Sequence, residues 1–273
     1  MRPLATMPAD ARRAVRGVLA DIDDTITTHG ELTASAYAAL ARLRAAGLLV
    51  VPITGRPAGW CDHIARMWPV DGVVGENGAF WMRYDRAARR LVRRFVADDA
   101  TRAANRARLA AIGERILRAV PGTALASDQN YREADLAIDF REDVAPLPRA
   151  DVDRIVALME AEGLTAKVSS IHVNGWFGGY DKLTTTRALF ADAFGTDLDA
   201  DRARYVFAGD SPNDAPMFGY FPLAVGMANV RPFLDRIATP PAYVTEEEAG
   251  TGFVQLADFL LEGLTLNMHS TSC

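Results

Sequence analysis

One short segment constrains the fold of this chain more than any other. In VLADIDDT, residues 18–25, an apolar run ends in three acidic residues and a threonine. Side chains alternate across a strand, so we expect Asp21 and Asp23 to share one face and Asp24 to point away. Two carboxylates at one strand end repel each other, and a folded protein keeps such a pair where a cation or a shared proton compensates them. An acidic loop that caps the next helix is the alternative.

Two further apolar segments, residues 48–53 and 70–74, have the continuous hydrophobicity of strands that are buried on both faces. Helices are expected between them, because Thr33 can cap one helix and Pro57 suits the first turn of another. This strand–helix order predicts a parallel sheet with both faces covered. The same pattern returns after Gly178-Gly179. The strands expected there are residues 205–208, 223–225 and 242–244.

The middle of the chain has a different pattern. Its expected strands alternate in polarity, as in an antiparallel sheet with one wet face, and helices are expected at residues 102–120 and 149–162. We therefore predict an α/β fold in which an α+β domain is inserted into a Rossmann-like, doubly wound parallel core. The predicted core comprises residues 1–83 and 181–273, and the insertion comprises residues 84–180.

The composition excludes several classes of protein. The 273 residues, 49% hydrophobic and 24% charged, suit one large or two modest soluble domains. A formal net charge of −5 argues against a broad nucleic-acid-binding surface. The first 17 residues contain no apolar stretch long enough for a signal peptide or a membrane span, so we expect a cytoplasmic protein with no nucleic-acid or membrane partner. A monomer and a homodimer both remain open.

Polar residues follow three of the expected parallel strands, where ligand sites of such sheets lie. Lys182, at the start of the helix that returns from the insertion, is unfavourably placed for a cation, which indicates that something anionic faces it. Several carboxylates, a hydroxyl and cations are what a Mg²⁺-dependent phosphoryl-transfer site needs. The residues at the strand ends are Asp21, Asp23, Thr54, Arg56, Asp210, Asn213 and Asp214.

Four segments, in this order along the chain, resemble the motifs of the haloacid dehalogenase (HAD) superfamily. They are DIDDT at residues 21–25, Thr54-Gly55, Lys182, and GDSPND at residues 209–214. The insertion resembles the type IIB (C2B) cap of Cof-like, sucrose-phosphate and mannosylphosphoglycerate phosphatases and of phosphomannomutases. The segment ENGA, residues 76–79, resembles the same branch.

The resemblance implies a role for each motif residue. Asp21 would be the nucleophile that forms an aspartyl-phosphate, and Asp23 would protonate the leaving oxygen and then activate water. Thr54 would hydrogen-bond the phosphoryl oxygens, and Lys182 would pair with them and with Asp21. Asp214 would hold a metal-bound water or orient Lys182. The implied Mg²⁺ site comprises Asp21, Asp23 through its backbone carbonyl, Asp210 and Asp214.

Substrate contacts follow less directly from the motifs. Arg56 can contact the substrate or pair with an acid, and both interpretations stay open. Arg132 and Asn174, in the insertion, are candidates for contacts with a sugar or with a second anion. Asn77 and Asn213 are expected beside the substrate because of their places in the segments that resemble the family.

These expectations together predict a Mg²⁺-dependent phosphatase for a small phosphate ester, a sugar phosphate, under a closing cap. An acid two residues after the nucleophile is, in this superfamily, the pattern of phosphatases and phosphomutases, so a sugar phosphomutase is one alternative. A non-catalytic sugar-phosphate-binding protein is the other. Asp24 stands where Cof-like members often have Gly, and by strand alternation we expect it to face away and assign it no catalytic role.

Overall fold

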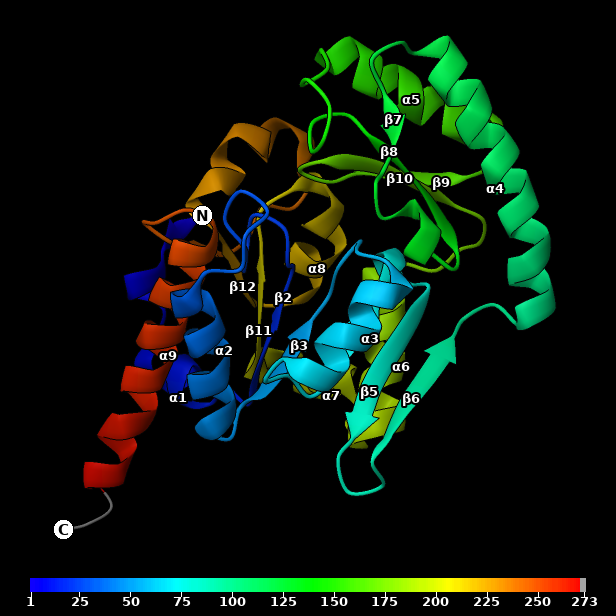
Figure 1. Cartoon of the computed structure of the whole chain (residues 1–273). Coiled ribbons are helices and arrows are strands. Elements are labelled where there is room, and N and C mark those ends of the chain that lie inside the picture. Colours follow the sequence, from blue (N-terminus) through cyan, green and yellow to red (C-terminus); the bar gives the residue numbers. More distant parts are fainter. Residues whose placement is uncertain (271–273) are drawn as a thin grey trace.

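The computed structural model describes residues 1–270 and contains a six-stranded parallel core sheet (Figure 1). Val18 of β2 lies beside Val206 and Val50, so the central strands are in register and end at the same edge. Every residue of β2 and β11 is buried, as the continuous apolar runs predicted. The strand order across the sheet is β1 (Arg2–Pro3), β13 (Tyr243–Val244), β12 (Leu223–Gly226), β11 (Tyr205–Gly209), β2 (Gly17–Ala20) and β3 (Leu49–Pro52).

Helices cover both faces of the core sheet, and side chains alternate between the two hydrophobic clusters that result. Val18 packs on the first cluster and Leu19 on the second. Thr33 caps the first helix of this layer by accepting a hydrogen bond from the backbone N–H of Ala36. The first face carries α1 (Ala9–Arg13), α2 (Ala34–Ala45), α3 (Ala58–Met67) and α9 (Ala249–Ser270). The second carries α6 (Lys182–Leu189), the π-helical segment Phe190–Phe194, α7 (Leu198–Asp201) and α8 (Ala215–Tyr220).

The third predicted strand, β4 (Val73–Gly75), differs from its expected pairing. A single parallel bridge, between Ile53 and Val74, joins it to the edge of the core sheet. Along its length it pairs antiparallel with β5 (Phe80–Asp85), which continues into β6 (Arg90–Phe95). The reason is the tight turn after β4, where Glu76 and Asn77 adopt positive φ angles of 44° and 53° and return the chain at once.

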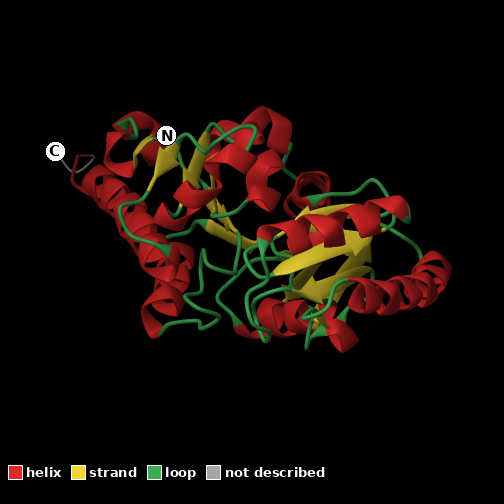
Figure 2. Ribbon diagram, turned by 90° about the horizontal axis from the view of Figure 1, so that it is seen from above, coloured by secondary structure: helices red, strands yellow, loops and turns green. Residues whose placement is uncertain are grey.

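A four-stranded antiparallel sheet and two helices form the cap, which here denotes the elements from α4 to β10 (Figure 1). Seen from above, its strands form a group apart from those of the core (Figure 2). The helices pack on one face of the cap sheet, over residues such as Leu136 and Val173. The cap consists of α4 (Asp99–Ala119), β7 (Ala124–Leu125), β8 (Asp135–Asp139), α5 (Arg149–Ala161), β9 (Thr165–Val168) and β10 (His172–Trp176).

The opposite face of the cap sheet is polar, but it is not exposed to solvent. Asp135, Asp139, His172 and Asn174 alternate with the apolar residues of β8 and β10, as the sequence predicted, yet all four are at most 3% exposed. This face is turned toward the core, so its polar groups meet protein partners in place of water. The proposed division of the chain at residues 84 and 180 stays a prediction. Within residues 1–270, no helix combines the length and apolar character that crossing a membrane requires.

Candidate active site

Four charged side chains from three distant segments meet at the carboxyl edge of the core sheet. Carboxylate oxygens of Asp21, Asp210 and Asp214 lie within 4.8 Å of one another, and all three residues are buried. Asp21 comes directly after β2, and Asp210 directly after β11. Lys182, the first residue of α6, places its Nζ 2.6 Å from Asp21 Oδ1 and 2.8 Å from Asp214 Oδ1. The parallel register of β2 and β11 is what brings these segments together.

The turn after β11 holds Asp214 in place. The backbone N–H groups of Asp210 and Ser211 donate to Asp214 Oδ2 at 3.1 and 3.3 Å. A Cβ atom on Gly209 would lie 2.5 Å from the same oxygen, so a glycine is required there. Asn213 Oδ1 accepts a hydrogen bond from Ser211 Oγ at 2.8 Å within this turn. The carboxylate of Asp214 thereby fixes Lys182, one of the two roles that the sequence analysis left open for it.

Asp210 has neighbours that the sequence analysis did not identify. Thr25 Oγ1 donates to its Oδ1 at 3.4 Å, and Asn229 Nδ2 donates to its Oδ2 at 3.1 Å. Asn229 also donates to the backbone carbonyl of Asp24 at 2.9 Å and accepts from the N–H of Ala249. Asn229 therefore links the first and last motif loops to the start of α9. It lies outside every motif, and no pattern in the sequence marks it.

The electrostatics of this cluster fit a divalent cation. Burial raises the pKa of Asp21 to about 8; Lys182 opposes that rise, while Asp214 and Asp23 add to it. Burial and the charges of Asp21 and Asp214 also raise the pKa of Asp210 well above its usual range. Among the residues that the structure describes, Lys182 is the one cation that forms ion pairs within this cluster, and it pairs with Asp21 and Asp214 but not with Asp210. Hard carboxylate oxygens with excess negative charge are the donor set that Mg²⁺ prefers.

The reason given for the orientation of Asp24 does not hold, and the orientation itself stays a prediction. Its charge adds to the raised pKa of Asp210. Strand alternation does not apply to Asp24, because β2 ends at Ala20 and the residue lies in a turn with a φ of 56°.

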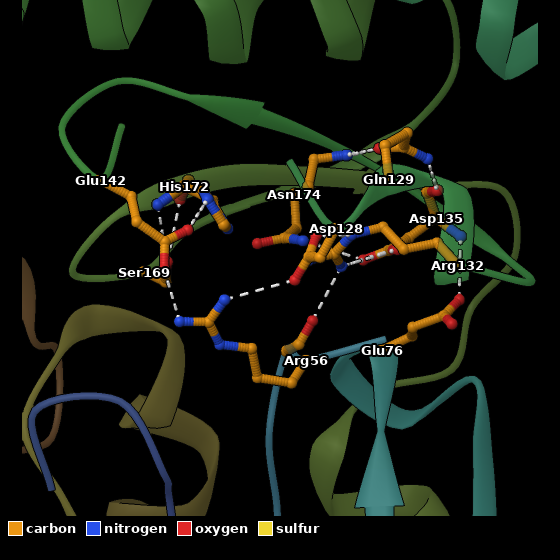
Figure 3. A network of polar contacts seen from close by, with 12 residues as sticks. Arg56, Glu76, Asp128, Gln129, Arg132, Asp135, Glu142, Ser169, His172 and Asn174 are labelled. Carbon is orange, nitrogen blue, oxygen red and sulfur yellow. Dashed lines mark hydrogen bonds and ion pairs between the residues drawn. The ribbon is translucent and has the colours of Figure 1, made fainter. Parts of the chain in front are cut away.

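Asp23 is held by Arg56. The Nε of Arg56 donates to both carboxylate oxygens of Asp23, at 3.0 and 3.1 Å. The same guanidinium contacts two acids of the cap, Asp128 at 3.3 Å and Glu142 at 2.6 Å (Figure 3). It also lies over the ring of Trp60, with its Cζ 4.5 Å from the centroid. Of the two interpretations of Arg56, the structure supports pairing with acids, and the side chain is only 4% exposed.

A second buried arginine links the cap to the core. Arg132 makes ion pairs with Asp128 and Asp135 and donates to the backbone carbonyl of Gly55 at 2.8 Å (Figure 3). Asn174 donates to Asp135 at 2.9 Å. The polar groups of Arg132 and Asn174 thus bind neighbouring residues in this arrangement of cap and core. Their role as substrate contacts stays a prediction.

Two carboxylates that the sequence analysis gave no role complete this network. Glu76 is fully buried and accepts hydrogen bonds from four backbone N–H groups, one at Ala58 of α3 and three at residues 133–135 of the cap. Glu142 lies 2.8 Å from His172 Nε2. Burial alone would raise the pKa of Glu142, but hydrogen bonds from His172 and Arg56 lower it to about 2. Glu76 lies in the segment ENGA that the sequence analysis identified, but no local sequence pattern marks either acid as buried.

Thr54 and Asn77 lie beside this network. Thr54 is fully buried, and its Oγ1 accepts from the backbone N–H of Arg56 at 2.9 Å. The Nδ2 of Asn77 is buried without a hydrogen-bond partner among the described residues. Asn77 lines a cavity of 220 Å³ that Lys182 and Asn213 also line. The roles predicted for Thr54, Asn77 and Asn213 toward a substrate remain predictions.

Comparison with known proteins shows a shared fold at low sequence identity. Neither protein-family models nor curated proteins match this chain. A phosphatase of the haloalkanoate (HAD) enzyme superfamily from Bacteroides thetaiotaomicron is 20% identical, with a TM-score of 0.59 over 93% of this chain and 97% of that chain. The sucrose-phosphatase from Synechocystis sp. PCC6803 is 14% identical, with a TM-score of 0.60 over 90% and 98% of the two chains.

A third solved structure belongs to subclass IIB of the superfamily. BT4131, a sugar phosphatase of HAD subclass IIB, is 15% identical, with a TM-score of 0.55 over 85% of this chain and 93% of that chain. At such identities the likeness concerns the fold, and it confirms the fold that the sequence resemblance implied, a parallel core with an inserted antiparallel cap.

Proposed function

This chain has the fold of subclass IIB of the HAD superfamily, and on that basis we propose that it is a Mg²⁺-dependent phosphatase for a small phosphate monoester. The observation that carries the proposal is the buried cluster of Asp21, Asp210, Asp214 and Lys182 at the carboxyl edge of the sheet. We expect the substrate to be a sugar phosphate. Two of the structural neighbours, a sucrose-phosphatase and a sugar phosphatase, support this choice.

The proposed reaction proceeds in two steps on Asp21. In the first, Asp21 Oδ attacks phosphorus and the bond to the leaving oxygen breaks, while Asp23 donates a proton to that oxygen. In the second, Asp23 takes a proton from a water molecule, whose oxygen displaces the Asp21 carboxylate from phosphorus and releases phosphate. The first step uses the proton of Asp23 and forms a bond between Asp21 and phosphorus. The second step returns a proton to Asp23 and breaks that bond, so both side chains are restored.

Lys182 and the metal site supply positive charge for this chemistry. The ammonium of Lys182, 2.6 Å from Asp21, can pair with the phosphoryl oxygens that approach that carboxylate. Mg²⁺ would be held by Asp21, Asp210, the backbone carbonyl of Asp23 and Asp214, directly or through water. When bound, it would neutralise charge so that an anionic carboxylate can approach an anionic phosphate. Thr54 would hydrogen-bond the same phosphoryl oxygens.

Two alternatives use the same residues. A sugar phosphomutase would need a phosphorylated activator and would return an isomerised sugar phosphate, so phosphate release from hexose 1- and 6-phosphates distinguishes it from a phosphatase. A non-catalytic sugar-phosphate-binding protein would have no use for a nucleophile and an acid held beside a lysine. The ion pairs of Asp21 with Lys182 and of Asp23 with Arg56 therefore favour an enzyme.

The test is release of phosphate from p-nitrophenyl phosphate with Mg²⁺. We expect turnover that EDTA and Asp21→Asn each abolish, while Asp62→Asn, at an exposed acid on α3, leaves it intact. Asp23→Asn should slow an alkyl phosphate much more than the p-nitrophenyl ester, because p-nitrophenolate leaves without a proton. Turnover that survives both EDTA and Asp21→Asn would refute the proposal.

A further inference from the structure

A second, larger cavity is lined by Asp23 and not by Lys182. It has a volume of 590 Å³ and is lined by Asp23, by Leu32 of the loop after β2, and by Trp60, His63 and Trp68 on or just after α3. Tyr131 of the cap closes one side of it. This volume falls in the range of small-molecule sites, which is roughly 300–1,000 Å³. None of the roles assigned so far uses this cavity.

The position of Asp23 indicates which part of a substrate this cavity could hold. In the proposed reaction Lys182 pairs with the phosphoryl oxygens, and Asp23 serves the leaving oxygen. The 220 Å³ cavity is lined by Lys182 and not by Asp23, whereas the 590 Å³ cavity is lined by Asp23 and not by Lys182. An alcohol whose oxygen meets Asp23 therefore extends into the larger cavity.

The walls of the larger cavity suit a flat ring better than a bare sugar. Trp60 and Tyr131 are 43% and 59% exposed, unusually high for large aromatic side chains. Thr27 is a polar residue of the wall, but its hydroxyl already donates to the carbonyl of Ile22 and accepts from the N–H of Asp24. Beyond Asp23 and His63 the wall offers a hexose few free partners for its hydroxyls, while an aromatic ring could pack on the exposed faces of Trp60 and Tyr131.

A residue of the cap completes this cavity. Tyr131 follows the turn at Asp128, which pairs with Arg56, and its ring lies against Gly59 of α3. A Cβ on Gly59 would come within 3.0 Å of the Tyr131 Cβ, so the small residue permits the close approach. On the other side, Trp60 is held by the guanidinium of Arg56. The two exposed aromatic residues are thus positioned by the same arginine that holds Asp23.

Building on the proposed function, we propose that this aromatic cavity receives the leaving group, and that the substrate is a sugar phosphate carrying a flat aromatic ring, as a nucleoside 5′-monophosphate does. The phosphate lies at Asp21 and Lys182, the ester oxygen at Asp23, and the ring against Trp60 and Tyr131. This narrows the substrate class from sugar phosphates in general to those with a ring beyond the sugar.

The test compares two substrates that differ by the ring alone, AMP and ribose 5-phosphate, with Mg²⁺ present. We expect kcat/KM to be at least tenfold higher for AMP, because only its ring can cover the aromatic walls. Trp60→Leu and Tyr131→Ala should each reduce this ratio several-fold. Tyr37→Ala, at an exposed aromatic residue of α2 outside the cavity, should leave the ratio within twofold.

The ratio of kcat/KM for AMP to kcat/KM for ribose 5-phosphate tests the ring site independently of the proposed phosphatase function. Trp60→Leu also disturbs Arg56, but that effect lowers kcat/KM for both substrates and therefore cancels in the ratio of the two values. If Trp60→Leu does not fold, the variant at the more exposed Tyr131 decides. Equal kcat/KM values for the two substrates, or a ratio that Tyr131→Ala leaves unchanged, would overturn the inference while the phosphatase stands.

If neither ester is hydrolysed and p-nitrophenyl phosphate is also inert, the proposed function fails. Calorimetric binding of the same two compounds then decides the cavity's role. Binding of AMP at least tenfold tighter than ribose 5-phosphate, and weakened by Tyr131→Ala, would uphold the ring site. Equal affinities would refute it.

Discussion

Arg56 donates two hydrogen bonds to Asp23, and the same guanidinium reaches Asp128 and Glu142 of the cap. One buried cation therefore binds both the expected acid–base residue and the domain that covers it. In this arrangement both carboxylate oxygens of Asp23 accept hydrogen bonds from Arg56. A proton on either oxygen would displace one of these bonds, so we infer that Arg56 shifts when Asp23 donates a proton to a leaving oxygen.

Removal of Arg56 should destabilise the junction between core and cap. Arg56→Gln leaves Asp23, Asp128 and Glu142 without a shared cation, and we expect it to lower the free energy of unfolding by about 3 kcal/mol. Urea unfolding measures this loss, and faster proteolysis within the cap should accompany it. The control is Arg66→Gln, an exposed arginine on α3 paired with Asp62, for which we expect less than about 0.5 kcal/mol.

Replacing one carboxylate of the proposed metal site should separate two effects on the melting temperature, the repulsion among buried carboxylates and the binding of Mg²⁺. Without Mg²⁺, Asp210→Asn should melt no lower than the unsubstituted chain, because it removes one of three crowded buried carboxylates. Added Mg²⁺ should raise the melting temperature of the unsubstituted chain but not of the variant, since only the former has the full donor set. Thermal scans with Mg²⁺ and with EDTA check this, with Asp199→Asn at an exposed site as control. An equal response of both proteins to Mg²⁺ would contradict the assignment.

Glu142 should contribute stability that disappears in acid. Its pKa is lowered from 4.5 to about 2 by His172 and Arg56, so its contribution is present above pH 4.5 and is lost as the pH falls toward 2. We expect Glu142→Gln to lower the free energy of unfolding at pH 7 by on the order of 1 kcal/mol, since solvent screens this partly exposed group. The gap between variant and unsubstituted chain should shrink below pH 4.5.

Denaturant titrations at several pH values measure the Glu142 effect. Glu160→Gln, at an exposed acid on α5, serves as the matched control and should show no such convergence. A gap that stays constant from pH 7 to pH 3 would be inconsistent with the ion pair.

Glu76 should be more important for stability than for chemistry. An amide in its place cannot accept all four backbone hydrogen bonds, so Glu76→Gln leaves buried N–H groups of α3 and the cap unsatisfied. We expect a loss of about 2–4 kcal/mol in the free energy of unfolding. Chemical denaturation measures the loss, and Glu133→Gln, which removes a surface pair with Arg106, is the control. A loss no larger than that of Glu133→Gln would contradict this prediction, because it would mean that the backbone N–H groups find other hydrogen-bond partners.

Much of the core could be predicted from the sequence, because its signals are local. Continuous apolar runs marked β2, β3 and β11, and each run was followed by the polar residues of one site. Parallel strands end at one edge of a sheet, so the meeting of Asp21 with Asp210 followed from the pattern alone. The alternating polarity of the cap sheet was visible for the same reason.

The tertiary structure alone decided which charges face one another. The partners of Arg56 lie 33, 72 and 86 residues away in sequence, and those of Glu76 lie up to 59 residues away. No spacing rule links such positions, because their contacts depend on how the cap packs on the core. The same packing buries the polar face of the cap sheet. The chain's local pattern thus determined the sheet and the residues at its edge, while long-range packing determined the ionic partners and the cavity that they enclose.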